Sequence, residues 1–262
     1  MADRVTIAVV QPDLLGTYGD IGNALVMAQR AKWRGIAAEV IVAAIDDDLP
    51  GDGGIILLGG AEDEAQAALC AADSPLRRTL ASAVDRGGVV FAVCAGLQML
   101  GRSFTAGGRR VAGLGLIDAE SGPMERRAVG EILTESTIDG SALTGFENHA
   151  GGTLLGSGCA PLGRLRKGSG NGDGRTDGVA SGRVFGTYLH GPALARNPAL
   201  ADHLLSIPLG PLAALDVPEV DVAREFWLHE LNADAGDGAA RWDRLRGRRP
   251  GRPILLRPDA LD

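Results

Sequence analysis

The sequence contains little of what several classes of protein depend on. Only three of its 262 residues are cysteines, an odd number without paired spacing, so we expect no disulfide framework. No CxxC or HxxxH pair accompanies them, and we expect no bound metal. No segment approaches the roughly 20 apolar residues that span a bilayer, and the N-terminus passes from a charged pair straight into a strand-like run. We therefore expect a cytoplasmic protein without a transmembrane segment.

Positive charge is also scarce. The chain has 26 lysines and arginines against 33 aspartates and glutamates, a formal net charge of -7, so nucleic acid is not an expected partner. The exception is the segment 241–257, which carries seven arginines and a single aspartate. This composition predicts a solvated tail over residues 237–262. An arm that docks on a partner or on anionic lipid is the alternative.

What the chain does contain is apolar sequence in strand-length runs. Four such runs alternate with patterns of helical period, and they are apolar throughout rather than at every second residue. Continuous apolar strands separated by helices predict an α/β fold whose mostly parallel sheet is covered on both faces. The predicted strands are Val5–Val10, Val40–Ala44, Gly54–Leu58 and Val89–Val93, and the predicted helices are Ile21–Arg34 and Leu76–Asp85.

The pattern changes from about Val111 onward. Short strand-like runs joined by glycine-rich connections predict antiparallel additions to the same sheet. A late amphipathic helix is predicted over Val217–Ala233. We therefore expect a main domain over residues 1–207, a C-terminal helical extension over 208–236, and the arginine-rich tail.

The stretch GVVFAVCAGLQMLG, residues 88–101, places a cysteine where an apolar strand turns into a helix. A sharp strand-to-helix turn exposes its central side chain and needs small neighbours, which Ala92, Ala95 and Gly96 supply. The helix N-terminus is expected to stabilise the thiolate of Cys94. Cys94 is therefore a candidate nucleophile, whereas the other two cysteines, Cys70 and Cys159, are interpreted as small buried hydrophobes.

A thiol that attacks a carbonyl carbon needs a proton carrier, and histidine suits that role near neutral pH. The chain has four histidines. His190 ends an apolar strand, so we place it at the same sheet edge as the cysteine. His149 is its rival, whereas His203 and His229 fall in helix-like stretches and are interpreted as ordinary residues.

Two backbone amides would have to hold the oxyanion that such an attack creates. The amide of Ala95 follows the nucleophile directly. The pair Gly59 and Gly60 ends the strand Gly54–Leu58 and can bring a second amide close, with Gly60 as the expected donor. A plain turn is the alternative interpretation of this pair.

These residues resemble a known family, the class I glutamine amidotransferases in the branch related to cobyric acid synthase. The resemblance lies in LLGG (57–60), CAGLQ (94–98) and YLHGP (188–192). More narrowly, the chain is similar to the glutaminase subunits of lipid II isoglutaminyl synthase. That similarity lies in TYGDIGN (17–23), GFENHAG (145–151), KGSGNGDGRTDG (167–178) and GTYLHGPALARNPALADHLL (186–205). Together the motifs cover about residues 5–207.

The resemblance implies a three-layer α/β sandwich and a glutaminase. Cys94 would attack the amide carbon of L-glutamine, His190 would protonate the departing ammonia, and water would hydrolyse the thioester. Gln98 would shape the glutamine pocket, or it is a surface helix residue. Arg127 best matches the arginine that holds the substrate α-carboxylate, with Arg126 as its rival.

The resemblance further implies a heterodimer with a MurT-like Mur ligase subunit. That partner would bind ATP and Mg and use the ammonia to amidate the D-glutamate α-carboxyl of lipid II. No cofactor is expected in this chain, because no G-x-x-x-x-G-K-[ST] motif occurs. A cobalamin-pathway amidotransferase subunit and a non-catalytic scaffold that only binds a ligase are the alternatives.

The chain departs from the family pattern two residues after the histidine, where Pro192 stands in place of the usual carboxylate. The thiol and imidazole could work as a dyad, use a distant acid of the chain, or receive one from the partner. Our hypothesis is the last. Asp20 and Asn23 are interpreted as helix-capping or packing residues rather than a nucleotide site, and NGDGRTDG as a turn rather than a calcium loop.

Overall fold

A mostly parallel sheet forms the centre of the computed structural model, which describes residues 3–17 and 19–233. Its six strands run in the order β11-β12-β4-β3-β1-β2, and β11, at one edge, is antiparallel to its neighbour. The strands are β1 (Arg4–Val10), β2 (Ala37–Ala43), β3 (Gly54–Leu58), β4 (Val89–Val93), β11 (Val179–Ser181) and β12 (Val184–Thr187). The predicted α/β fold is confirmed, and β3 and β4 have the predicted bounds.

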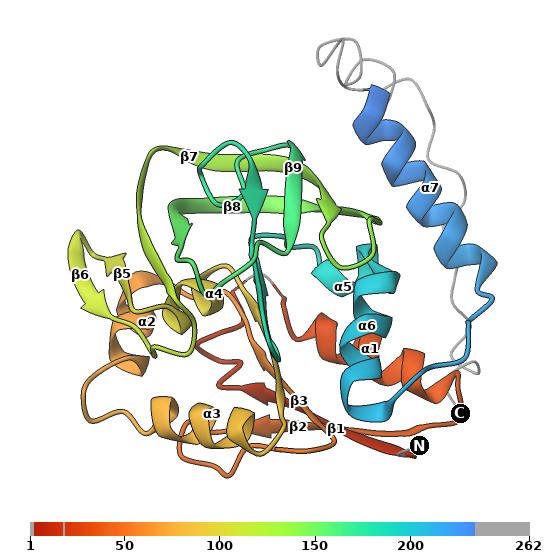
Figure 1. The fold of residues 1–262 in the computed structure, drawn as a ribbon, viewed down its shortest axis with the longest axis horizontal. Helices are drawn as coiled ribbons and strands as arrows, with labels where there is room; N and C mark the ends of the chain where they lie inside the picture. Colours follow the sequence, from red (N-terminus) through yellow and green to blue (C-terminus); the bar gives the residue numbers. More distant parts are fainter. Residues whose placement is uncertain (1–2, 18, 234–262) are drawn as a thin grey trace.

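Helices cover both faces of this sheet. In Figure 1, α1, α5 and α6 gather on one side, and α2, α3 and α4 lie on the other. This arrangement follows from right-handed crossovers, since the chain moves along the sheet in opposite directions after β1 and after β3. The helices are α1 (Gly22–Lys32), α2 (Asp63–Leu69), α3 (Leu76–Asp85), α4 (Ala95–Leu100), α5 (Ala193–Arg196) and α6 (Pro198–Leu209).

The sequence predicts that the segment after Val111 adds antiparallel strands to the first sheet, and this prediction is wrong for most of the segment. Most of it builds a second six-stranded sheet in the order β10-β9-β7-β5-β6, with β8 paired to β7, and only β11 and β12 join the first sheet. Its longest members pair as one antiparallel hairpin. The strands are β5 (Ser103–Ala106), β6 (Arg109–Ala112), β7 (Ala119–Ser136), β8 (Ala142–Leu155), β9 (Gly163–Lys167) and β10 (Thr176–Asp177).

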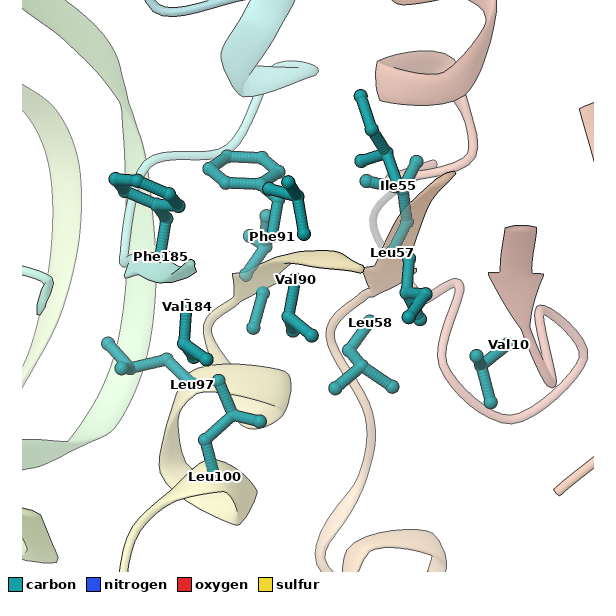
Figure 2. Close-up of a cluster of buried hydrophobic side chains, with 14 of the residues drawn as sticks. Val10, Ile55, Leu57, Leu58, Val90, Phe91, Leu97, Leu100, Val184 and Phe185 are labelled. Carbon is teal, nitrogen blue, oxygen red and sulfur yellow. The ribbon is translucent and has the colours of Figure 1, made fainter. Parts of the chain in front are cut away.

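The core of the first sheet is built from alternating side chains on its three fully buried strands, β3, β4 and β12. In Figure 2, Phe91 and Phe185 point to one face of the sheet, whereas Val90 and Val184 point to the other. Leu97 of α4 lies on the second face, and a Cβ at Gly186 would come within 2.7 Å of its Cδ1 atom. This close contact fixes α4, and the cysteine that precedes it, against the carboxyl ends of β4 and β12.

The C-terminal part of the described chain is helix α7 (Pro218–Ala233), close to the predicted Val217–Ala233. The predicted boundary at residue 207 falls inside α6, which ends at Leu209. The arginine-rich tail lies outside the described residues. Within residues 3–17 and 19–233, every helix falls short of the length and apolarity that crossing a membrane would require.

An ion-pair cluster ties α1 to α6. Arg30 and Arg34, whose side chains are 8% and 5% exposed, both donate to the carboxylate of Asp202, at distances from 2.6 to 3.1 Å. Burial acts to raise the pKa of Asp202, but the hydrogen bonds and charges of the two arginines hold it below its ordinary value. The helices are thus joined by one shared carboxylate.

Replacing Asp202 with alanine is therefore expected to lower the free energy of unfolding by about 2 to 3 kcal/mol, because two buried guanidinium groups lose their partner. The loss is not larger because the Asp202 side chain is itself 27% exposed. The difference should be largest above pH 4 and shrink as the pH falls through the lowered pKa. Denaturant unfolding measures it. Glu39→Ala, which removes the exposed Arg4–Glu39 pair, is the control and should cost less than about 1 kcal/mol. Equal losses in the two variants would contradict this account.

Candidate active site

Cys94 occupies the strained turn between β4 and α4. Its backbone has φ 54° and ψ -107°, in a region that non-glycine residues rarely adopt, and Gln11 is the other such residue in the described chain. Small neighbours make the turn possible, since a Cβ at Gly96 would lie 2.7 Å from the Leu58 carbonyl oxygen. The sequence-based prediction of a sharp cysteine turn with small flanking residues is confirmed.

The environment of Cys94 keeps it a thiol. Burial raises its pKa to about 12, with the negative charge of Asp20 as the next cause, and the hydrogen bond from the amide of Ala95 offsets only part of this. The expectation that the helix N-terminus stabilises a thiolate is wrong for this state. Helix α4 has six residues, and burial together with a nearby carboxylate outweighs the one amide that reaches the sulfur.

The glycine pair after β3 packs against the loop that follows β1. A Cβ at Gly59 would stand 2.0 Å from the Leu15 carbonyl oxygen, so only glycine fits there. The amide of Gly60, the predicted oxyanion donor, gives its hydrogen bond to Asp20 Oδ2 at 2.8 Å. The Gly60 amide can therefore donate to an oxyanion only if its hydrogen bond to Asp20 first breaks.

His190 lies at the same sheet edge as Cys94, as predicted. It follows β12, whose Thr187 carbonyl accepts the amide of Cys94 at 2.8 Å, and its own backbone pairs with Phe146 of β8. Its Nδ1 atom lies 3.4 Å from Asp20 Oδ1 in a fully buried pair. An acid of this chain thus faces the imidazole, which is evidence against our hypothesis that the partner supplies it.

Asp20 accordingly contacts three parts of the site. Its two carboxylate oxygens face His190 and the Gly60 amide, and its charge acts on the thiol of Cys94. The sequence analysis missed this role and assigned Asp20 to capping or packing. Asn23, by contrast, is a packing residue, since its Oδ1 atom accepts the amide of Leu194 at 2.9 Å.

The rival histidine, His149, lines the cavity that opens beside Cys94, but its ring belongs to a buried hydrogen-bond network. Its Nδ1 atom bonds the Gly151 carbonyl at 2.7 Å, its Nε2 atom faces Glu147 at 3.4 Å, and its ring stacks on Tyr188 at 3.9 Å. Although burial acts to raise it, the pKa of Glu147 lies below its ordinary value because His149 and two backbone amides donate hydrogen bonds. Both ring nitrogens of His149 are thus committed to structural contacts.

The glycine-rich segment KGSGNGDGRTDG wraps around this network. The amides of Ser169 and Gly170 donate to Glu147, and Asp173 accepts from the Arg175 and Thr176 amides as a turn does. No cluster of three or more metal-ligating side chains occurs in the described part of the chain. The segment is therefore the turn we predicted, and it supports the wall of the site.

A cavity of about 380 Å³ opens beside Cys94, and three of the six predicted site residues line it, namely Cys94, Gln98 and Arg127. The other three, His190, Gly60 and Ala95, are not among its lining residues. Gln98 lines it, buried rather than on the surface, and donates to the hydroxyl of Tyr188 at 3.2 Å. Arg127 also lines it, with its Nε atom donating to Asn148 at 2.8 Å. Arg126 lines a neighbouring cavity instead, so the structure separates the two arginines.

Several lining residues escaped the sequence analysis, among them Glu62, Gln66 and Asn148. Asn148 accepts a hydrogen bond from Arg127 and so orients its guanidinium. Arg127 lies in the irregular part of the β7–β8 pairing, between Pro123 and Ala128. Residue types alone could not have indicated this pairing.

Replacing Asp20 with asparagine is expected to shift the alkylation of Cys94 to lower pH, because the carboxylate raises the thiol pKa. Peptide mapping after iodoacetamide treatment across a pH series follows Cys94 separately from the other cysteines. Asp13→Asn, in the same loop but exposed, is the matched control and should leave the profile unchanged. An unaltered profile in Asp20→Asn would show that this carboxylate does not act on the sulfur.

The fold is also found in solved glutamine amidotransferases. A crystal structure of a glutamine amidotransferase matches with a TM-score of 0.53 and 21% identity, over 77% of this chain and 98% of that one. The structure of PurLQS from Thermotoga maritima matches with a TM-score of 0.55 and 19% identity, over 78% and 97%. This likeness shows that the chain shares the fold of these proteins.

Sequence comparison gives the family. The CobB/CobQ-like glutamine amidotransferase domain matches residues 6–198, and the chain belongs to this family. The GatD subunit of lipid II isoglutaminyl synthase (glutamine-hydrolyzing) from Streptococcus pneumoniae is 34% identical over 79% of this chain and 81% of that subunit. The GatD subunit from Staphylococcus aureus is 35% identical over 77% and 83%. Cobyric acid synthase from Brucella abortus is 33% identical over 59% of this chain but 32% of its own length.

Proposed function

We propose that this chain is the glutaminase subunit of a lipid II amidating complex and that Cys94 is its nucleophile. The observation that carries the proposal is the strained cysteine turn beside a cavity that also presents the Arg127 guanidinium. A guanidinium suits the α-carboxylate of glutamine. The thiol at the turn is then positioned to meet the side-chain amide.

The reaction proceeds in two halves. The Cys94 thiol gives its proton to the His190 imidazole as sulfur bonds to the amide carbon, and the carbonyl becomes an oxyanion held by the Ala95 amide. When the oxyanion collapses, the C–N bond breaks and the imidazolium protonates the departing ammonia. Water then attacks the thioester, giving its proton to His190, and glutamate leaves as the thiol regains that proton.

Asp20 has two parts in this mechanism. Its carboxylate faces Nδ1 of His190, so it orients the ring and stabilises the imidazolium that forms. It also holds the Gly60 amide, which becomes available to the oxyanion only when that bond opens. The free chain thus contains a thiol of high pKa and an occupied amide, two features of a resting state.

The partner is a MurT-like Mur ligase subunit that binds ATP and Mg and amidates the D-glutamate α-carboxyl of lipid II with the released ammonia. Support comes from the two GatD relatives, which match this chain over about four fifths of its length. The cobyric acid synthase match covers a third of that protein, so the cobalamin-type alternative has less support. The chain is expected to act in the cytoplasm and to bind no cofactor itself.

Co-expression with a Mur-ligase-like subunit, followed by purification of the complex, tests this function. The complex should convert lipid II to its D-isoglutamine form with glutamine and ATP, as read by mass spectrometry. A Cys94→Ala complex should do so with ammonium salts but not with glutamine. Equal use of glutamine by both complexes would instead identify the chain as a non-catalytic scaffold.

A further inference from the structure

Asp177 is a buried carboxylate that the mechanism above does not use. It stands near the end of the glycine-rich segment, lies on β10 of the second sheet, and is 0% exposed. Its Oδ2 atom accepts the hydroxyl of Thr187 at 2.6 Å, and its Oδ1 atom accepts the amide of Tyr188 at 3.2 Å. Thr187 ends β12 of the first sheet. One carboxylate thus joins the two sheets directly before the residues that lead to His190.

The ionisation of Asp177 sets the direction of these hydrogen bonds. Burial raises its pKa to about 6, and the hydrogen bonds from Thr187 and Tyr188 offset part of that rise. At neutral pH the carboxylate is therefore ionised and can only accept. The Thr187 hydroxyl donates to it, which leaves a lone pair of Oγ1 for the amide of Leu189 at 3.1 Å. An ionised carboxylate is costly to bury, and groups of this kind gather at functional sites.

Thr187 lies between the two reacting groups of the proposed mechanism. Its backbone carbonyl accepts the amide of Cys94 at 2.8 Å. Its hydroxyl is bound to Asp177 and accepts the amide of Leu189, which closes the turn that leads into His190. The same residue therefore anchors the backbone of the nucleophile and the segment that carries the imidazole.

The glycine-rich segment is what brings Asp177 to β12. The side chain of Asn171 bonds both backbone groups of Gly178, at 2.9 Å to the amide and 3.0 Å to the carbonyl. Gly178 has φ 65°, and a Cβ there would stand 2.1 Å from the carbonyl oxygen of Gly186 in β12, so only glycine allows this approach. The segment thus holds a carboxylate against the strand that precedes His190.

We propose that Asp177 is a positioning residue, which acts through Thr187 to hold His190 in the place that proton transfer with Cys94 requires. The inference rests on the proposed glutaminase function. Neither Asp177 nor Thr187 is among the residues that line the cavity beside Cys94, so their effect passes through the turn at 187–189. A misplacement of about 1 Å can cost about a hundredfold in rate. Loss of the Asp177–Thr187 hydrogen bond should therefore slow the reaction without weakening the binding of glutamine.

Steady-state glutamate release by the complex tests the positioning role. Thr187→Val removes the hydroxyl but keeps the shape of the side chain, so kcat should fall about tenfold to a hundredfold while KM stays within about threefold. Thr187→Ser keeps the hydroxyl and should retain kcat within about threefold of the wild type. Asp177→Asn replaces one of the two accepting oxygens with a donor, should lower kcat like Thr187→Val, and serves in its place if that chain does not fold. Full kcat in the folded variant, or an equal loss in Thr187→Ser, would overturn the proposal.

Two controls separate positioning from a loss of stability. Thr134→Val makes the same chemical change at a buried threonine whose hydroxyl has no hydrogen-bond partner among the described residues, so it should keep the wild-type kcat. Asp202→Ala lowers stability through the ion-pair cluster between α1 and α6 and should also keep kcat while thermal unfolding shows a folded chain. A fall of kcat in Asp202→Ala as large as in Thr187→Val would identify instability as the cause and overturn the positioning role.

Amide hydrogen exchange on the full chain provides a readout that does not depend on glutamine hydrolysis. In Thr187→Val the amide of Leu189 loses its acceptor and should exchange about tenfold faster or more, whereas in Thr187→Ser it should exchange as in the wild type. Unchanged exchange in Thr187→Val would overturn the inference even if the complex is a glutaminase. Absence of glutamate release by the wild-type complex, with exchange behaving as expected, would instead contradict the proposed function.

Discussion

Cys94→Ala is expected to lower glutamate release by the complex about ten-thousandfold or more, leaving only the slow background hydrolysis. The reason is that no other nucleophile lines the cavity at a strained strand-to-helix turn. The variant should fold, because alanine fits where the buried cysteine stands. Glutamate appearance in a coupled assay, with thermal unfolding of the same sample, measures both properties.

Cys159→Ala is the matched control for this result. Cys159 is half-buried and lies outside the residues that line the cavity. It should retain the wild-type rate. Substantial glutamate release by Cys94→Ala, with the chain folded, would remove the thioester from the mechanism.

His190→Ala is expected to reduce kcat by about a hundredfold to ten-thousandfold, with KM changed little. The imidazole has to take the proton of a thiol whose pKa is about 12 and then deliver a proton to ammonia. Without it, neither the attack nor the departure has a proton carrier. Steady-state glutamate release measures the loss.

Two other histidine variants complete this test. His203→Gln lies outside the site, where its ring meets Phe185 edge-on, and should retain activity. His149→Gln disturbs the network under Gln98 and should act mainly through folding and substrate binding. If His149→Gln abolished kcat while His190→Ala preserved it, the roles assigned to the two histidines would have to be exchanged.

Under the proposed mechanism, the raised pKa of the Cys94 thiol would limit glutamine hydrolysis by the free subunit. At neutral pH Cys94 stays protonated, and the Gly60 amide is held by Asp20. Asp20 thus disfavours the thiolate of Cys94 and occupies the Gly60 amide. It also faces His190, the proton carrier in both steps of the proposed reaction. Under the proposed mechanism, the Gly60 amide reaches the oxyanion only after Asp20 releases it, while Asp20 keeps its contact with His190.

The central strands of the first sheet could be predicted from sequence because they are buried on both faces. Strand β2 is largely exposed and begins at Ala37, three residues before the predicted start at Val40. Continuous apolar runs predicted β3 and β4 with their observed bounds, and a pattern of helical period predicted α3 with its observed bounds. The second sheet could not be predicted in the same way. Strands β7 and β8 carry glycines, charges and a bulge, and their pairing depends on register over many residues rather than on local pattern.

The site divides in a similar way. Cys94 and His190 could be found because each sits at the end of an apolar strand, where local sequence indicates exposure at the sheet edge. Asp20 could not, since its partner His190 is 170 residues away in the chain.

The central claim is that a γ-glutamyl thioester forms on Cys94. Rapid acid quenching of the complex during turnover with L-glutamine, followed by peptide mass spectrometry, tests it directly. The account predicts one γ-glutamyl group on the peptide that contains Cys94, absent from Cys94→Ala and sensitive to hydroxylamine. Glutamate release at the full rate with that peptide unmodified, or with the group on another residue, would contradict it.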